Sequence, residues 1–353
     1  MKKELFIDLS WLNAKYSGGG YHSTLNIVEC ILSNKLILKK YQIIIITRKN
    51  LFLKKNFKNL KQITLSQSYF LNFIMRWFIL FFLSNRKKIQ IYFCPNIYST
   101  IFKLNFKVIN IFHDNQWKYF PENFSFLKIF WLKFNIFLCL NISDTIICTS
   151  KFVFNEFKLL NKSNKLKQIY IPFKNKKKFK KLSKVKKKFA FILSSLLPHK
   201  NVKIIEKIFH ETNSFRKIKN LIIAGIGGKS KEIFINNKKI LYLKKISESE
   251  KNWLYKNCEF FLHPSKYEGF GMTIIEALYQ KKTVICSDLK VLREIGFNSL
   301  NYVKNFSSTK EWSDKIYNLK SKNKARIKIR ELDRYFSYHV ISKKYFNILE
   351  SLV

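Results

Sequence analysis

Short apolar runs alternate with longer segments of helical periodicity along the 353-residue chain. Leu5–Leu9, Tyr41–Thr47 and Val108–Phe112 are short and mostly apolar, and the four consecutive isoleucines of Tyr41–Thr47 are typical of a parallel strand buried on both faces. After the first of these runs, Tyr21–Leu32 carries apolar residues at three- and four-residue spacing, which predicts a helix. Alternating strands and helices predict an α/β fold with doubly wound parallel sheets.

The second half of the chain repeats this pattern, with predicted strands at Phe189–Leu193, Ile240–Leu243 and Thr283–Asp288. The chain also exceeds the length at which a single core usually stops growing, so two domains are expected. Lysine dominates residues 173–188, where no apolar periodicity occurs, and this segment is predicted to be a basic linker or a polybasic membrane tether. We therefore expect an N-terminal Rossmann-like domain over 1–172 and a second one over 189–335.

Two apolar stretches, Phe70–Leu83 and Phe126–Leu140, fall short of the ~18 uninterrupted apolar residues that a membrane span needs. Asn72 and Arg76 interrupt the first stretch, and lysines interrupt the second. We expect core helices here. The alternative is that these helices lie in a membrane interface, with the apolar face in lipid and Lys and Arg at the headgroups.

The chain is strongly basic, with 67 Lys and Arg against 22 Asp and Glu and a formal net charge of +45. Part of this charge follows the joint abundance of Lys, Asn, Ile and Phe that AT-rich codons produce. A selected basic face would favour an anionic membrane surface. The six cysteines form no Cys-x-x-Cys pair and are expected to be reduced and buried, and the start of the chain lacks the pattern of a signal peptide. A cytoplasmic location is expected, with the inner face of the membrane as a further site.

The most informative stretch joins a predicted strand, Phe260–Leu262, to a predicted helix, Thr273–Leu278. Gly269 and Gly271 in the intervening loop allow the backbone to approach a ligand, and the free N–H groups of the following helix favour a phosphate. Glu268 and Glu276 flank the loop with carboxylates that accept hydrogen bonds from hydroxyls. A phosphate and hydroxyls together describe a nucleotide sugar.

The string Pro-Ser-x-x-Glu-Gly-Phe-Gly-x-x-x-x-Glu-Ala at 264–277 resembles the donor-site signature of the retaining glycosyltransferases of family 4, whose two glutamates are separated by seven residues. This resemblance implies the GT-B fold, with two Rossmann-like domains facing across a cleft and a C-terminal helix, 336–353, packing back on the N-terminal domain. It also implies that Glu268 holds sugar hydroxyls and Glu276 holds the ribose. The implied donor-binding loop is completed by Gly269, Phe270, Gly271, Met272 and Thr273.

Other predicted site residues follow strands elsewhere. His113 and Asp114 come at the carboxyl end of Val108–Phe112, the edge where open α/β sheets bind ligands, and they resemble the family's His-Asp element beside the transferred sugar. Gly19 and Gly20 follow the first strand and resemble the family's loop facing the donor diphosphate and the acceptor. Lys200 stands where the family carries a basic pair that binds the diphosphate. We assign His113, Lys200 and Glu268 as catalytic.

The resemblance implies a glycosyltransferase of hexosyltransferase type. We expect it to be metal-independent, because no Asp-x-Asp metal site occurs in the sequence. Its predicted partners are a nucleotide-diphosphate sugar as donor and a glycan or lipid-linked acceptor, in bacterial polysaccharide or lipopolysaccharide synthesis, with peripheral contact to an anionic membrane. We expect no further cofactor and no nucleic acid. A GT-B sugar-nucleotide epimerase and a non-catalytic basic nucleic-acid-binding protein stay open as alternatives; salt-sensitive nucleic-acid binding without nucleotide-sugar affinity would favour the second.

Overall fold

The computed structural model describes residues 2–12, 18–48, 60–85, 89–159, 164–185, 188–227, 229–319 and 327–353. The chain divides into two compact units. Unit 1 comprises Met1–Asn115, Phe124–Pro172 and Arg334–Val353, and unit 2 comprises Gln116–Asn123 and Phe173–Asp333. No helix among the described residues combines the length and the hydropathy needed to cross a bilayer.

Unit 1 is built on a seven-stranded sheet in the order β3-β2-β1-β4-β5-β6-β7, with every neighbouring pair parallel. Its strands are β1 Lys3–Asp8, β2 Tyr41–Arg48, β3 Leu60–Leu65, β4 Ile89–Cys94, β5 Lys107–Phe112, β6 Thr145–Cys148 and β7 Leu166–Gln168. The continuously apolar β2 is buried along most of its length, as expected for a strand covered on both faces. The strand order reverses between β1 and β4, which makes the carboxyl ends of these strands the switch point of the sheet.

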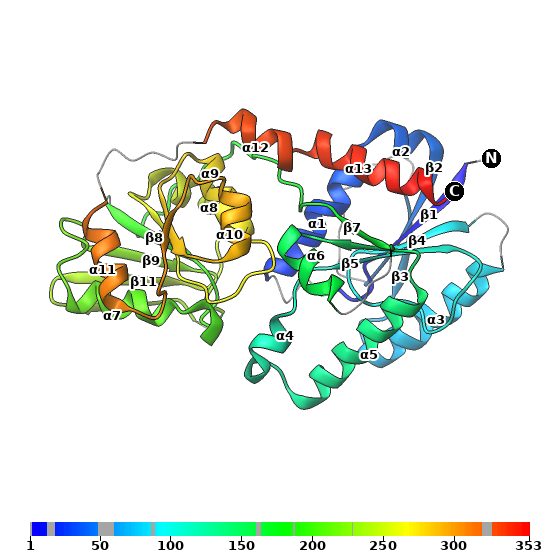
Figure 1. Ribbon diagram of the computed structural model, residues 1–353, viewed down its shortest axis with the longest axis horizontal. Coiled ribbons are helices and arrows are strands. Elements are labelled where there is room, and N and C mark those ends of the chain that lie inside the picture. Colours follow the sequence, from blue (N-terminus) through cyan, green and yellow to red (C-terminus); the bar gives the residue numbers. More distant parts are fainter. Residues whose placement is uncertain are drawn as a thin grey trace. The chain divides into compact units, whose positions relative to one another are not determined.

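Helices cover both faces of this sheet (Figure 1). They are α1 Gly19–Leu32, α2 Lys35–Lys40, α3 Tyr69–Ser84, α5 Phe126–Ile142, α6 Lys151–Lys158 and α13 Tyr338–Ser351. The C-terminal α13 contacts α1, and its Tyr345 ring packs against Phe93 of β4 at 5.9 Å between ring centroids. Ser150 caps the start of α6, because its hydroxyl accepts from the Val153 N–H at 3.0 Å.

Unit 2 is built on a second seven-stranded sheet, in the order β10-β11-β9-β8-β12-β13-β14. Its strands are β8 Phe189–Leu193, β9 Asn220–Ala224, β10 Lys231–Ile235, β11 Lys238–Leu243, β12 Phe261–His263, β13 Val284–Ser287 and β14 Asn301–Val303. Its helices are α4 Gln116–Tyr119, α7 Val202–Glu211, α8 Glu248–Asn257, α9 Met272–Tyr279, α10 Lys290–Gly296 and α11 Thr309–Tyr317, with single 3-10 turns η1 at Pro121–Asn123 and η2 at Pro198–Lys200. Helix α12, Ile329–Phe336, crosses the division between the units.

The sheet of unit 2 is parallel except at one edge, where β10 pairs antiparallel with β11. Asn236 and Asn237 connect these two strands with φ values of 49° and 58°, a left-handed turn that suits the twist of a two-residue hairpin. The sequence prediction included β11 but missed β10. The doubly wound α/β fold itself is confirmed in both units.

The described part of the lysine-rich segment, residues 173–185, belongs to unit 2 and is hydrogen-bonded to it. The Asn252 side-chain amide donates to the carbonyls of Lys176 at 2.7 Å and Lys178 at 3.2 Å, and the Lys180 N–H donates to the Ser249 carbonyl at 3.0 Å. The backbone of this segment is therefore fixed along α8 while its lysine side chains supply charge. All six cysteines are free and buried, as predicted.

Candidate functional site

The predicted strand, glycine loop and helix are present at β12 and α9. Gly271 is the N-cap of α9 and has a φ of +94°, a conformation that residues with a Cβ rarely adopt. A Cβ at this position would also lie 2.8 Å from Leu292 Cδ2 and 3.1 Å from Ile295 Cδ1 of α10. Glycine is therefore required both by the turn and by the close packing of α10.

Glu268 of this loop lies beside two basic groups of unit 2. Its Oε1 is 2.7 Å from Lys200 Nζ and 3.1 Å from His263 Nε2, and all three side chains are largely buried. Lys200 is brought there by η2, which follows β8, and His263 ends β12. Burial alone would raise the pKa of Glu268, but the Lys200 ammonium and His263 hold that pKa well below its ordinary value. The carboxylate is ionised.

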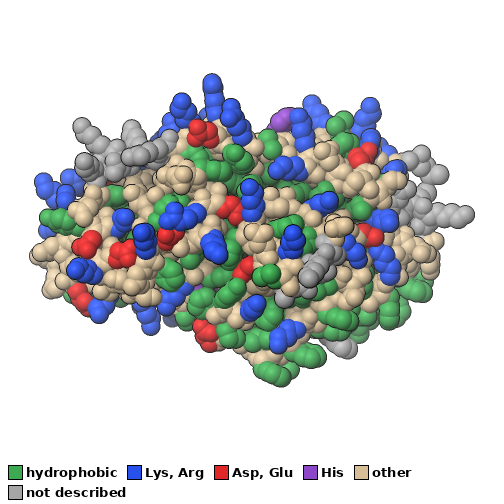
Figure 2. All heavy atoms as spheres, viewed as in Figure 1, with side chains coloured by type: hydrophobic (Ala, Val, Ile, Leu, Met, Phe, Trp, Pro, Cys, Tyr) green, Lys and Arg blue, Asp and Glu red, His purple; other side chains and the backbone are tan. Residues whose placement is uncertain are grey.

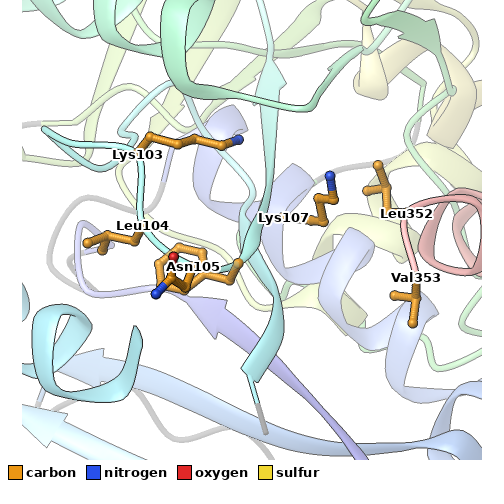
Figure 3. Close-up of a pocket in the computed structure, with 7 residues that line it drawn as sticks. Lys103, Leu104, Asn105, Lys107, Leu352 and Val353 are labelled. Atoms are coloured by element: carbon orange, nitrogen blue, oxygen red, sulfur yellow. The ribbon is translucent and has the colours of Figure 1, made fainter. Parts of the chain in front are cut away.

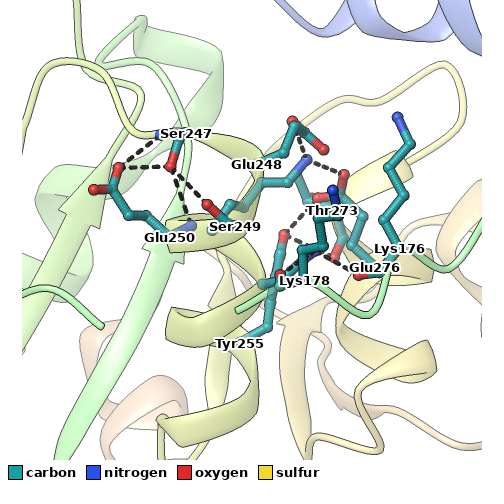
Figure 4. A network of polar contacts seen from close by, with 11 residues as sticks. Lys176, Lys178, Ser247, Glu248, Ser249, Glu250, Tyr255, Thr273 and Glu276 are labelled. Atoms are coloured by element: carbon teal, nitrogen blue, oxygen red, sulfur yellow. Dashed lines mark hydrogen bonds and ion pairs between the residues drawn. The ribbon is translucent and has the colours of Figure 1, made fainter. Parts of the chain in front are cut away.

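Glu276, on the second turn of α9, has both carboxylate oxygens engaged. Oε1 lies 2.6 Å from Lys251 Nζ, and Oε2 accepts from the Tyr255 hydroxyl at 2.9 Å (Figure 4). Lys251 also lies 3.0 Å from Glu248. Burial would lower the pKa of Lys251, but Glu276 and Glu248 raise it above its ordinary value, so the ammonium keeps its charge. A carboxylate has about four acceptor sites, so these contacts leave Glu276 able to accept from further hydroxyls.

A continuous series of contacts joins the two glutamates. Glu268 lies beside His263 Nε2, and His263 Nδ1 lies 3.2 Å from the Thr273 hydroxyl. The Thr273 carbonyl lies 3.2 Å from the Tyr255 hydroxyl, which donates to Glu276. We call this set the donor network, after the nucleotide-sugar donor that the sequence predicts here. Its members are Lys200, Glu268, His263, Thr273, Tyr255, Glu276 and Lys251.

The structure therefore brings together Lys200, Glu268, Thr273 and Glu276, four of the residues predicted from the sequence. Sequence analysis gave no role to His263, Tyr255 or Lys251. No local pattern marks Lys251 as a site residue, because lysine is everywhere in this chain. His263 is the last residue of a strand, and Tyr255 lies on the buried side of a helix. Core residues are as common as site residues at such positions.

A short segment from the first half of the chain also packs into unit 2 beside the donor network. Gln116 and Asn123 place their side-chain amides 3.2 Å and 3.1 Å from His199 Nδ1, which precedes Lys200. Tyr119 stacks on Tyr267 with 5.0 Å between ring centroids. Burial and then the Lys200 charge lower the pKa of His199 to about 4, so its neutral ring accepts from these amides. Sequence analysis did not predict that residues 116–123 belong to unit 2.

Of the remaining predicted residues, Gly269, Phe270 and Met272 belong to the loop and the start of α9 in unit 2, and the others lie in unit 1. His113 follows β5, and its Nε2 lies 3.0 Å from the Pro95 carbonyl, which can only accept; Nε2 therefore carries the proton. Burial lowers the pKa of His113 and keeps the ring neutral, while the bond to Pro95 and the charge of Asp114 oppose this shift. Gly19 and Gly20 open α1, and no heavy atom of the described residues lies within 4 Å of a Cβ placed on either glycine. Residues 13–17, which precede them, lie outside the described residues.

Unit 1 also has an open hollow of about 390 Å³, lined by Lys103, Leu104, Asn105, Phe106, Lys107, Leu352 and Val353 (Figure 3). This hollow is lined by none of the predicted site residues. Within the described ranges, no group of three or more His, Cys, Asp and Glu side chains has the arrangement to hold a metal ion.

Comparison with known proteins gives a family for unit 2. Residues 173–334 match the family described as glycosyl transferases group 1. The chain is 36% identical to the O-antigen chain mannosyltransferase RfbU of Salmonella typhimurium over 81 residues, 23% of either chain. It is 26% identical over 208 residues, 55% of either chain, to an uncharacterized glycosyltransferase of Methanocaldococcus jannaschii. These alignments span 23% and 55% of the relatives' own length.

Solved structures resemble the chain over nearly its whole length. Sucrose-phosphate synthase from Thermosynechococcus elongatus has a TM-score of 0.73 at 12% identity, covering 99% of each chain. Anabaena HepE, solved with UDP and glucose, has a TM-score of 0.69 at 15% identity, covering 99% of this chain and 100% of its own. The lipopolysaccharide outer core galactosyltransferase WaaB has a TM-score of 0.65 at 15% identity, with the same coverage. At these identities the likeness concerns the fold, and it confirms the predicted GT-B fold.

Proposed function

We propose that this chain, whose residues 173–334 match the glycosyl transferases group 1 family, transfers a sugar from a nucleotide-diphosphate-sugar donor to a hydroxyl group. The proposed acceptor is a glycan or a lipid-linked glycan of a bacterial cell-surface polysaccharide or lipopolysaccharide. Two O-antigen chain mannosyltransferases among the relatives support this acceptor class, and the UDP and glucose bound to HepE support the donor class.

The observation that carries the proposal is the donor network of unit 2. It holds two carboxylates, Glu268 and Glu276, at either end of one series of polar contacts, next to the backbone N–H groups that open α9. Ionised carboxylates accept hydrogen bonds from sugar and ribose hydroxyls, while a helix N-terminus and the Lys200 ammonium favour the diphosphate between them. A nucleotide sugar presents matching groups in the same order, with sugar hydroxyls, a diphosphate and ribose hydroxyls.

In the proposed reaction, the bond between the anomeric carbon and a diphosphate oxygen breaks, and the acceptor oxygen bonds to that carbon. The acceptor attacks from the side of the leaving group, so the anomeric configuration is retained, and the acceptor proton leaves with the diphosphate. Negative charge grows on the diphosphate, where Lys200 and the amides of Gly269–Met272 stabilise it. Glu268 orients the sugar through its hydroxyls and is not a covalent nucleophile.

His113, Gly19 and Gly20 complete the proposal from unit 1. The neutral His113 ring donates through Nε2 to the Pro95 carbonyl and positions the peptide groups at the carboxyl end of β4. Gly19 and Gly20 have no Cβ, so the backbone at the start of α1 can approach the donor diphosphate or the acceptor closely. We also propose peripheral contact with an anionic membrane at its inner face, where lipid-linked acceptors are available.

The test is release of nucleoside diphosphate from a panel of UDP- and GDP-sugars by the purified full chain, with and without added acceptor lipid. Glu268→Gln and Glu276→Gln should each lose at least about tenfold in kcat/KM, because each removes a charge-assisted hydrogen bond worth about 1.5–3 kcal/mol. The matched control is Glu232→Gln on β10, which removes a carboxylate 2.7 Å from Lys239 outside the donor network.

Turnover at the wild-type rate in both Glu268→Gln and Glu276→Gln would refute the assignment of the donor site. Absence of binding and hydrolysis across the whole panel would refute the proposed activity. NMR of the product's anomeric proton would test retention separately.

A further inference from the structure

Two helices of unit 1 expose large apolar side chains along their outer faces. The exposed fractions on α3 are 52% for Leu71, 61% for Phe78, 57% for Phe81 and 65% for Phe82. The exposed fractions on α5 are 81% for Phe126, 77% for Leu127, 65% for Phe130 and 61% for Phe137. At 100° per residue, each set falls on one side of its helix. We call these eight residues the phenylalanine face.

The polarity of α3 is inverted relative to that of an ordinary surface helix. Its polar residues Asn72 and Arg76 point inward and are 3% and 7% exposed. Arg76 Nε lies 2.7 Å from the buried carboxylate of Asp8, and its Nη2 donates to the Tyr92 hydroxyl at 2.8 Å. The interfacial alternative from the sequence, with this arginine at lipid headgroups, is therefore wrong for Arg76. Water-soluble helices normally place phenylalanine inward and arginine outward.

Helix α5 has the same inverted polarity as α3. Asn135 is 3% exposed and donates to the Trp131 carbonyl, whereas the phenylalanines on the opposite side are turned outward. Each helix still buries one face, because Leu80 of α3 and Leu138 of α5 belong to a single hydrophobic cluster against the sheet. The prediction of core helices is thus right for the inner faces only.

The two halves of the phenylalanine face lie on the same side of unit 1. The inner faces of α3 and α5 share the cluster just described, and Tyr98 contacts both helices: its carbonyl accepts from Arg76 and its hydroxyl from Lys128 of α5. Figure 2 shows hydrophobic side chains gathered along the lower edge of the molecule, where Figure 1 places α3 and α5. The apolar area therefore forms one surface.

The charges on these helices have one sign. Neither 69–84 nor 126–142 contains an Asp or Glu, and α5 carries Lys128 and Lys133, both exposed. Such a surface fits a partner that is apolar inside and anionic outside. A second copy of this chain fits poorly, because each copy has a formal net charge of +45 and the two would repel.

We propose that the phenylalanine face docks on a bilayer containing anionic lipid, with the phenylalanines at the boundary of headgroups and acyl chains and Lys133 of α5 at the phosphates. This inference rests on the membrane contact in the proposed function, and it is independent of the glycosyl transfer. It assigns that contact to α3 and α5 rather than to the lysine-rich segment 173–188.

The test is flotation of the full chain with unilamellar vesicles, either of pure phosphatidylcholine or with about one third phosphatidylglycerol. The wild type should float with the anionic vesicles, less at high salt and least with the neutral ones. Phe130→Ser combined with Phe137→Ser, and separately Phe78→Ser combined with Phe82→Ser, should each weaken partitioning at least about tenfold. The matched control is Phe234→Ser on β10 of unit 2, where the phenylalanine is 67% exposed.

Three outcomes would overturn the inference: a wild type that does not float, face variants that float like the wild type, or a wild-type dimer in sedimentation that both pairs of substitutions dissociate. The variants remove exposed side chains, so their thermal unfolding midpoints should not fall. Donor hydrolysis in detergent-free buffer should also be unchanged in them. Loss of flotation with intact hydrolysis thus separates this inference from the glycosyl transfer, whose failure would appear as no hydrolysis in any variant.

Discussion

Replacing Glu268 by glutamine removes the carboxylate that lies 2.7 Å from Lys200 Nζ and should affect two steps in opposite directions. Without a ligand the two side chains neutralise each other, yet we assign them to different parts of the donor. Glu268→Gln should therefore bind UDP or GDP more tightly than the wild type, because the Lys200 ammonium becomes available to the diphosphate. Turnover should fall, because the sugar loses an ionised acceptor.

The magnitude follows from the geometry of the pair. Two unit charges 2.7 Å apart attract by about 6 kcal/mol at an effective dielectric constant of 20. The side chains are 22% and 14% exposed, and desolvation offsets most of this attraction, so we expect a net coupling of about 1–2 kcal/mol. Transferred to the nucleotide, this energy predicts binding about 5- to 30-fold tighter. The loss of one charge-assisted bond to a sugar hydroxyl predicts kcat/KM about 10- to 150-fold lower.

Isothermal titration calorimetry with UDP and with GDP would measure the first effect on the wild type, Glu268→Gln, Lys200→Met and the double variant. Lys200→Met should weaken nucleotide binding, and the control Glu232→Gln should leave it unchanged. Urea unfolding of the wild type, the two single variants Glu268→Gln and Lys200→Met, and the double variant gives the coupling energy as a double-mutant cycle. Weaker nucleotide binding in Glu268→Gln, or a coupling below about 0.5 kcal/mol, would refute the reasoning.

Gly271→Ala should lower the free energy of unfolding by about 2 kcal/mol, since its φ is +94° and the new Cβ would meet α10; an unchanged urea midpoint would contradict this. Tyr255→Phe should cost about 1–2 kcal/mol of stability and weaken UDP or GDP binding several-fold, because one oxygen of Glu276 loses its donor; unchanged calorimetry would count against the proposed role of Glu276. His199 has a pKa of about 4 in the fold against 6.5 ordinarily, so the unfolded state binds the extra proton between these values. Lowering the pH from 6.5 to 4 should therefore remove up to about 3 kcal/mol of stability, and a pH series on His199→Gln should lack this contribution.

The sequence predicted the parts of the proposed donor site that depend on local backbone. Gly271 could be predicted from the sequence because the turn into α9 excludes a Cβ. Glu268 and Glu276 could be predicted because they lie only a few residues from that turn along the chain. Lys200 was found only through its neighbours, since a lysine by itself carries no information in so basic a chain.

The parts that the sequence did not reveal depend on contacts between distant segments. Lys251 becomes a site residue only because α8 packs so that its side chain reaches Glu276 on α9. Arg76 was expected at headgroups or in a plain core helix, and its inward position is decided by Asp8 on a strand far away in the chain. An apolar run such as Phe126–Leu140 predicts a helix but does not tell which of its faces the sheet will cover. The hairpin between β10 and β11 could have been found, because the Asn236–Asn237 dipeptide favours a tight left-handed turn.

The membership of residues 116–123 in unit 2 has a practical consequence for dissecting this protein. A fragment cut to the matched region 173–334 would carry the whole donor network, yet its Tyr267 ring would lack the Tyr119 stack and its His199 would lose both amide donors. Chimeras that exchange the halves of related enzymes at residue 172 would break the same contacts. The transplantable module is therefore discontinuous in sequence, and an exchange should carry Gln116–Asn123 together with everything that follows Pro172.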